Sequence, residues 1–159
     1  MKTFIFSGRA IGILILSLAS LLIISCEKES TSGNGDTYAL SGNGSGAQEV
    51  PTNSSTGTAT LTGTYNASTN LLTYDIRWTN LTNVATGVHF HGPAMMGVSA
   101  GVLVSLTITT AGINGVASGN VTLTESQETA LLNGEVYYNI HTAAFVDGEV
   151  RGQVTATKN

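Results

Sequence analysis

The feature that most constrains the fold is a pair of neighbouring segments in which the side chains on one face are apolar or small at every second residue. The positions on this face are Ala59, Leu61, Gly63 and Tyr65 in the first segment, and Leu72, Tyr74, Ile76 and Trp78 in the second. Because strand side chains alternate between two faces, each segment predicts a strand with one buried face. Asp75 and Arg77 take the solvent side of the second strand. The stretch from Asn66 to Asn70 predicts a hairpin loop between them.

The rest of the chain from residue 38 to residue 159 has the same character. Thr, Val, Gly and Asn are abundant, charged residues are sparse, and turn signals recur about every ten residues. Further strands are expected at residues 86–91, 102–107, 119–123, 136–141 and 149–156. These patterns predict a single all-β domain, an antiparallel Greek-key β sandwich or barrel.

One segment departs from the period of two and predicts a short crossover helix. It runs from Thr124 to Leu132 and begins with a Thr-x-x-Gln pattern, in which Thr124 and Gln127 can form a capping box. Asn133 and Gly134 follow as a helix stop. Asp147 and Gly148 then predict a tight turn between the last two strands.

Residues 1–25 are expected to be a lipoprotein signal peptide. Lys2 and Arg9 form a positive region, and an apolar run from Ile11 to Ile24 follows. The sequence Ile-Ile-Ser-Cys that ends at Cys26 resembles a bacterial lipobox, which makes Cys26 the expected site of lipid attachment. The alternative is an uncleaved transmembrane helix, for which the run is short and diluted by serines.

Residues 26–37 are polar and Gly-rich and are expected to form a flexible tether to the domain at 38–159. The Glu27-Lys28-Glu29 sequence resembles the export tags of surface lipoproteins, so the expected location is the bacterial cell envelope. The protein would be anchored to the outer membrane, on either its surface or its periplasmic face. The lipid is then the expected contact with the membrane.

Composition also bears on partners and redox chemistry. Residues 1–25 hold two of the six basic residues and none of the ten acidic ones, so the mature chain has a formal charge of −6. With four scattered cations it has no basic stripe, which argues against nucleic acid as a partner. Cys26 is the single cysteine, and this excludes a disulfide or a thiol nucleophile in the domain.

The candidate chemistry lies in the three histidines. His89 and His91 stand two residues apart on a predicted strand, which puts both rings on one face about 7 Å apart, while Val88 and Phe90 point to the core. His141 ends another predicted strand. If the two strands are neighbours, the three imidazoles can converge and offer copper or zinc three ligands and an open position. The alternative is that each histidine bonds loop carbonyls at a strand end.

Several short motifs occur along the domain: Leu40-Ser41-Gly42, Ala47-Gln48-Glu49-Val50-Pro51, Leu72-Thr73-Tyr74, His89-Phe90-His91-Gly92, Leu131 to Gly134, Tyr138 to Thr142 and Gly148 to Gln153. Together they resemble the CHRD domain, the module repeated in chordin and found singly in bacterial envelope proteins. The resemblance covers nearly the whole mature domain, with departures at Thr52 and Phe145-Val146 that affect turns. It implies a β-sandwich binding module with no established catalysis, and we expect its ligand to be a protein or a glycan.

A looser likeness connects the segment from Leu81 to His91 with the copper-binding strand of Cu/Zn superoxide dismutase. The domain would then be either immunoglobulin-like or superoxide dismutase-like in architecture. With three histidines the chain lacks counterparts of that enzyme's bridging and zinc-binding ligands. We therefore expect no enzyme activity, and the likeness supports at most a copper- or zinc-binding redox or metal-handling domain.

Two charged residues invite a structural interpretation. Glu49 follows a polar loop, and Arg151 lies in the solvent-side register with Glu149 and Gln153. We expect Glu49 and Arg151 to form an ion pair that connects the N-terminal strand to the C-terminal hairpin. Two hypotheses of function remain open: a lipid-anchored binding or structural module, and a domain that handles copper or zinc.

Overall fold

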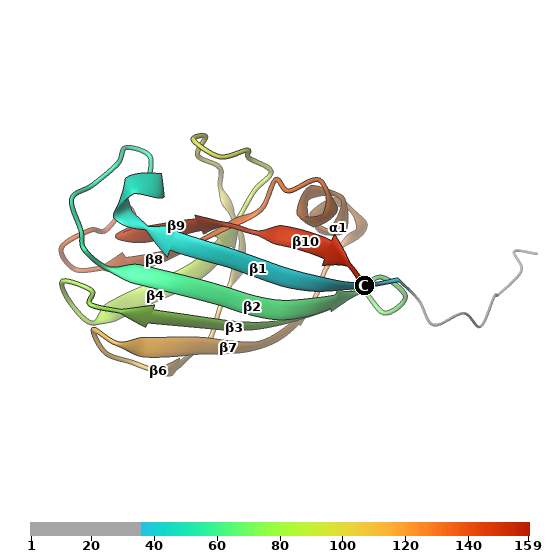
Figure 1. Ribbon diagram of the computed structural model, residues 1–159, viewed down its shortest axis with the longest axis horizontal. Helices are drawn as coiled ribbons and strands as arrows, with labels where there is room; N and C mark the ends of the chain where they lie inside the picture. Colours follow the sequence, from blue (N-terminus) through green and yellow to red (C-terminus); the bar gives the residue numbers. More distant parts are fainter. Residues whose placement is uncertain (1–35) are drawn as a thin grey trace, which may run out of the picture. The chain divides into compact units, whose positions relative to one another are not determined.

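The computed structural model describes residues 36–159 (Figure 1). Cys26, the expected signal peptide at 1–25 and the tether up to residue 35 lie outside the described residues. Helix α1 (Glu125–Leu132) and the short 3-10 helix η1 (Gly46–Gln48) accompany ten strands. The strands are β1 (Thr37–Ser45), β2 (Thr58–Asn66), β3 (Leu71–Thr79), β4 (Ala85–His91), β5 (Val102–Ser105), β6 (Ile108–Thr110), β7 (Gly115–Thr122), β8 (Tyr137–Thr142), β9 (Val150–Gln153) and β10 (Thr155–Lys158).

The ten strands form one curled antiparallel sheet. The order is β5-β4-β8-β9-β1-β2-β3-β7-β6, and β10 pairs with β1 beside this path. The outermost strands β5 and β6 are joined by only Leu106 and Thr107, whose amides donate to Val88 O and to Tyr74 Oη. The two ends of the sheet therefore meet, which confirms the expected all-β fold of sandwich or barrel type. Among residues 36–159, no helix is long and apolar enough to cross a membrane.

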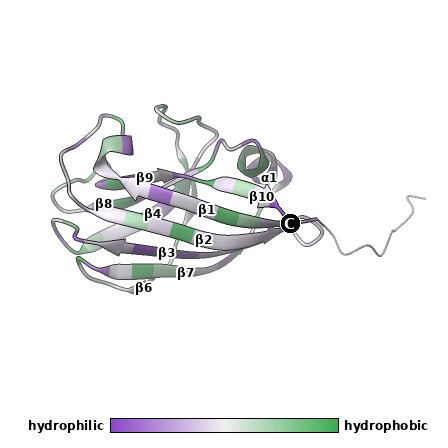
Figure 2. Cartoon of the chain, viewed as in Figure 1, coloured by the Kyte–Doolittle hydropathy of each residue, from purple (hydrophilic) through white to green (hydrophobic). Residues whose placement is uncertain are grey.

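The hairpin of β2 and β3 forms as the alternation predicts. Leu61 pairs with Ile76 and Tyr65 with Leu72, and all four side chains are buried. On the other face Asp75 and Arg77 form a salt bridge of 2.7 Å. Figure 2 shows this alternation along β2, where green hydrophobic bands are separated by pale ones.

The crossover helix also forms as expected. Thr124 Oγ1 accepts from the Gln127 amide while Gln127 Oε1 accepts from the Thr124 amide, which is the predicted capping box. The helix ends at Leu132, and Gly134 follows with φ of 73°, a conformation that favours glycine. The helix places Ala130 and Leu131 in the core.

One predicted strand is shorter in the structure and another is divided into two. The segment 102–107 ends its strand β5 at Ser105, because the chain then turns between the two ends of the sheet. The segment 149–156 becomes β9, which pairs with β8, and β10, which pairs with β1. The change of partner occurs at Val154, which is buried and donates its amide to Val136 O. Strand β1 alternates in burial but not in hydropathy, since Gly42 and Gly44 on its inner side face Tyr138 and have no room for a side chain.

Candidate metal centre

Strands β4, β8 and β9 have buried side chains on both faces. One set belongs to the hydrophobic core, and the other lies on the sheet face that points away from it. On the core side Val88, Phe90 and Ile140 are at most 2% exposed. On the opposite side, the register pairs Gly87 with His141, His89 with Asn139 and His91 with Tyr137. Arg151 of β9 lies next to Asn139 in the same row. Polar and aromatic side chains therefore meet on this face.

The structure brings His89, His91 and His141 together, because β4 and β8 are neighbours. Their ligand nitrogens lie within 4.8 Å of one another, and His89 Nδ1 is 3.0 Å from His141 Nε2. In a tetrahedral zinc site with bonds of about 2.05 Å, neighbouring nitrogens are about 3.3 Å apart. Ring movements of about an ångström would therefore produce this geometry. Gly87 makes room for the cluster, since a Cβ there would lie 3.2 Å from His89 Cε1.

Two backbone carbonyls determine which nitrogens face the cluster. His91 Nδ1 is 3.0 Å from Ala100 O, and His141 Nδ1 is 2.9 Å from Val146 O. A carbonyl oxygen only accepts hydrogen bonds, so each Nδ1 carries the proton and donates it. The Nε2 atoms of His91 and His141 then keep their lone pairs, and His141 Nε2 accepts a hydrogen bond from His89 Nδ1. Metal-binding histidines are oriented by the same kind of contact.

The environment favours neutral imidazoles. Burial lowers the pKa of His89, and the neighbouring His141 and His91 lower it further. Burial also lowers the pKa of His91, although the Ala100 carbonyl and Asn139 oppose this effect. A neutral ring with a free lone pair is the form that binds a metal ion. Among residues 36–159, His91 Nε2 is buried without a hydrogen-bond partner.

A stack of side chains supports His91 from one side. The Tyr137 ring is parallel to the His91 ring at 4.9 Å, and the Arg151 guanidinium lies 3.5 Å from the centre of the Tyr137 ring. Arg151 donates to Met95 O and Val98 O, and Tyr137 Oη contacts Ala100. The stack thus holds the 92–101 loop against β8 and β9, and with it the carbonyl that orients His91.

The expected direct ion pair of Glu49 and Arg151 is not formed. The salt bridges within residues 36–159 join Asp75 to Arg77 and Asp36 to Lys158. The solvent-side position that we expected for Arg151 is also wrong, since Arg151 is 1% exposed and Glu49 6%. The 92–101 loop covers Arg151 and the 143–149 turn reaches Glu49, which no periodic pattern indicates. The two charges still attract, but burial is the larger effect and raises the pKa of Glu49 to about 7.

Glu149 is a buried residue that the sequence placed on the solvent side, and that prediction is wrong. Its side chain is 0% exposed and accepts hydrogen bonds from Ser55, Thr82 and Thr142. These three donors come from segments far apart in the chain, so no local motif could have indicated them. Asn139, in the row between His89 and Arg151, is 3% exposed and was likewise not singled out from the sequence.

The fold and the site define a small antiparallel β domain with a three-histidine cluster on one outer sheet face. The sequence model of the CHRD domain matches residues 40–154, which is most of the chain. The chain therefore belongs to the CHRD domain family, as its motifs indicated. No curated protein and no solved structure gives a significant match. The looser likeness to Cu/Zn superoxide dismutase stays a prediction.

Proposed function

We propose that this CHRD domain is a metal-binding module in which His89, His91 and His141 hold one Cu²⁺ or Zn²⁺ ion. The observation that carries the proposal is the pair of Nδ1–H donations to Ala100 O and Val146 O. They leave lone pairs on two Nε2 atoms in a cluster whose ligand nitrogens lie within 4.8 Å of one another. Three imidazoles and an open position suit either copper or zinc.

A titration with each metal tests this proposal. All ten strands lie between residues 37 and 158, so a soluble fragment of residues 27–159 contains the whole described fold. This fragment has no cysteine, and its only histidines are the three of the cluster. Calorimetry and elemental analysis should give one equivalent of bound metal. For Cu²⁺, electron paramagnetic resonance should show nitrogen hyperfine structure.

The control is the triple variant His89→Ala, His91→Ala, His141→Ala, checked for folding by circular dichroism. It should lose the bound metal, and single replacements should weaken binding strongly. Equal metal uptake by the folded triple variant, or none by the parent fragment, would refute the proposal. The function would then be the alternative one, binding of a protein or glycan ligand without metal. The exposed apolar side chains of Met95, Met96 and Val146, on the loops that orient the histidines, favour that alternative.

We also propose that Cys26 carries a lipid that anchors the domain in the cell envelope, and that the domain binds rather than catalyses. The support for the anchor is the lipobox-like sequence before Cys26. Metabolic labelling with an alkyne fatty acid in a bacterial host should mark the full chain and leave the Cys26→Ser variant unlabelled. Equal labelling of both would overturn the assignment.

A further inference from the structure

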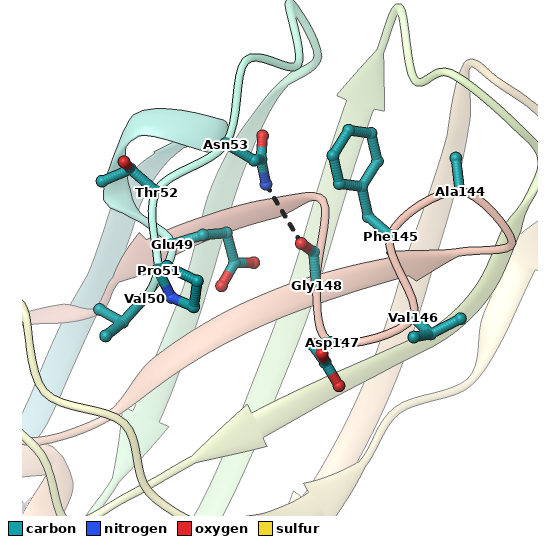
Figure 3. Close-up of a pocket in the computed structure, with 10 residues that line it drawn as sticks. All are labelled: Glu49, Val50, Pro51, Thr52, Asn53, Ala144, Phe145, Val146, Asp147 and Gly148. Carbon is teal, nitrogen blue, oxygen red and sulfur yellow. Dashed lines mark hydrogen bonds between the residues drawn. The ribbon is translucent and has the colours of Figure 1, made fainter.

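A cavity separate from the histidine cluster lies between the segments 49–53 and 144–148 (Figure 3). Its volume is about 230 Å³, and none of the three histidines lines it. Drug-sized sites measure roughly 300–1,000 Å³, so this cavity suits a small group. The two segments are held together by Asn53, whose Nδ2 donates to Gly148 O and Glu149 O.

The walls of this cavity are mainly apolar. Val50 and Pro51 come from the first segment, and Ala144, Phe145 and Val146 from the second. Figure 3 shows the rings of Pro51 and Phe145 on opposite segments, with the Glu49 carboxyl group between them. An apolar wall with an aromatic ring and one carboxylate is a recognisable combination, because alkyl chains pack on the wall and a cation pairs with the acid.

One buried acceptor that lines this cavity has no hydrogen-bond partner within residues 36–159. It is Glu49 Oε1, on a side chain that is 6% exposed. A Cβ built on Gly148 would collide with this oxygen, so the carboxyl group lies directly over the Gly148 backbone. A buried acceptor without a partner is costly, and an ionised carboxylate requires a donor, not another acceptor.

The local charge also favours a cation. The charged side chains near Glu49 are Arg151 on β9, which attracts it, and Asp147, which also lines the cavity. Glu149 behind them is negative and already accepts four hydrogen bonds. Three acids against one arginine leave a net negative neighbourhood, in a mature chain of formal charge −6.

We propose that this cavity is a binding site for an alkylammonium group, a class that includes free amines and lysine side chains. The ammonium donates to Glu49 Oε1, and the alkyl chain packs between Pro51 and Phe145. The proposal does not rest on the proposed metal binding.

The test is an amide NMR titration of the 27–159 fragment with n-butylammonium chloride, with neutral 1-butanol as the matched probe. Shifts should saturate with the amine, centre on the two segments that line the cavity, and be much weaker with the alcohol. For a carboxyl group with a pKa of about 7, the ionised fraction rises from about a tenth at pH 6 to about nine tenths at pH 8. Amine affinity should therefore rise about tenfold over that range.

Three variants make the test specific. Glu49→Gln keeps the shape of the side chain and removes its charge, so amine binding and its pH dependence should both disappear. Phe145→Leu should weaken the binding of amine without changing the pH dependence. The double variant His89→Ala, His91→Ala keeps the His141 contact to Val146 O and should bind the amine with the pH dependence of the parent, which separates this site from the metal centre.

A second pair of probes distinguishes the sources of the group. If Nα-acetyl-lysine methylamide binds and its Nε-acetyl form does not, the site accepts a lysine side chain of a partner. If n-butylammonium alone binds, the site takes a free amine. Equal binding of amine and alcohol, unchanged binding to folded Glu49→Gln, or no shift with any probe would overturn the proposal.

Discussion

The substitution Glu149→Gln should strongly destabilise the domain, although it preserves the size of the side chain. Glu149 Oε1 accepts from Ser55 Oγ at 2.7 Å, from the Thr82 amide at 2.7 Å and from Thr82 Oγ1 at 2.9 Å. Its Oε2 accepts from Thr142 Oγ1 at 2.6 Å. One carboxylate therefore joins three segments of the chain, and its side chain has no exposed surface.

The magnitude follows from these four bonds. A hydrogen bond to a charged group contributes about 1.5–3 kcal/mol, and one between neutral groups about 0.5–1.5 kcal/mol. Glutamine would lose about 1 kcal/mol at each bond and would present a donor to Thr142, so the expected loss is about 3–4 kcal/mol. At about 4 °C per kcal/mol for a domain of this size, Tm should fall by about 12–16 °C.

The pH dependence gives a second, independent check. Burial acts to raise the pKa of Glu149, but the hydrogen bonds from Thr142, Ser55 and Thr82 outweigh it and lower the pKa below its usual value. A carboxyl group with a lowered pKa contributes stability above its unfolded pKa of about 4.3, and this stability is lost as pH falls through the folded value. The difference between parent and variant should therefore shrink in acid.

Urea unfolding of the 27–159 fragment at pH 7 and at about pH 3 measures both effects. Glu125→Gln, an exposed acid in the first turn of α1, is the matched control and should cost less than about 1 kcal/mol. A loss below about 1 kcal/mol for Glu149→Gln at pH 7, or a loss that stays the same in acid, would refute the role of Glu149 as an ionised hydrogen-bonding centre.

Four further results are expected. Thr124→Ala removes the capping box and should cost about 1 kcal/mol in urea unfolding, whereas Thr129→Ala in the same helix should cost less; equal losses would contradict the cap. Gly87→Ala places a Cβ 3.2 Å from His89 Cε1 and should weaken metal binding about tenfold in the calorimetric titration, a result that unchanged affinity would disprove. Arg151→Met removes the donors to Met95 O and Val98 O, so the free energy of unfolding should fall by about 2–4 kcal/mol. Amide hydrogen exchange in the 92–101 loop should accelerate, and unchanged exchange would argue against this anchoring role. Because the pKa values of His89 and His91 are lowered, protons compete poorly with a metal ion for the imidazole nitrogens at neutral pH. Metal affinity measured as a function of pH should therefore fall only in acid, and a loss of affinity already at pH 7 would be inconsistent with neutral rings.

The parts of the structure that the sequence predicted well are those with a local signal. The period of two in β2 and β3 places Leu61 and Ile76 in the core, and the capping box places the start of α1 at Thr124. The convergence of the histidines was also foreseeable, given His89 and His91 on one strand face and His141 on a candidate neighbour.

The positions that were wrong depend on contacts between distant segments. Arg151 on β9 and Glu149 just before this strand lie on the same face of the segment. Their polar side chains predict that this face is exposed to solvent. Both are buried because loops cover the outer face of β4, β8 and β9, and Ser55 meets Glu149 across 94 positions of the chain. The sequence of a loop without periodicity gives no indication of the surface on which the loop packs. Polar strand residues beneath such a loop are therefore predicted to be exposed to solvent.

The burial of polar groups under these loops bears on where the function lies. In the described part of the chain, the buried side-chain atoms without a hydrogen-bond partner are Glu49 Oε1, His91 Nε2, Asn139 Oδ1 and Gln153 Oε1. Each costs about 1–3 kcal/mol, and apolar residues at these positions would remove that cost. His91 Nε2 and Asn139 Oδ1 belong to the histidine row of β4 and β8, and Glu49 Oε1 lines the separate cavity. A ligand that supplies a metal ion or a donor at these atoms recovers the cost on binding, which is why we assign both sites to them.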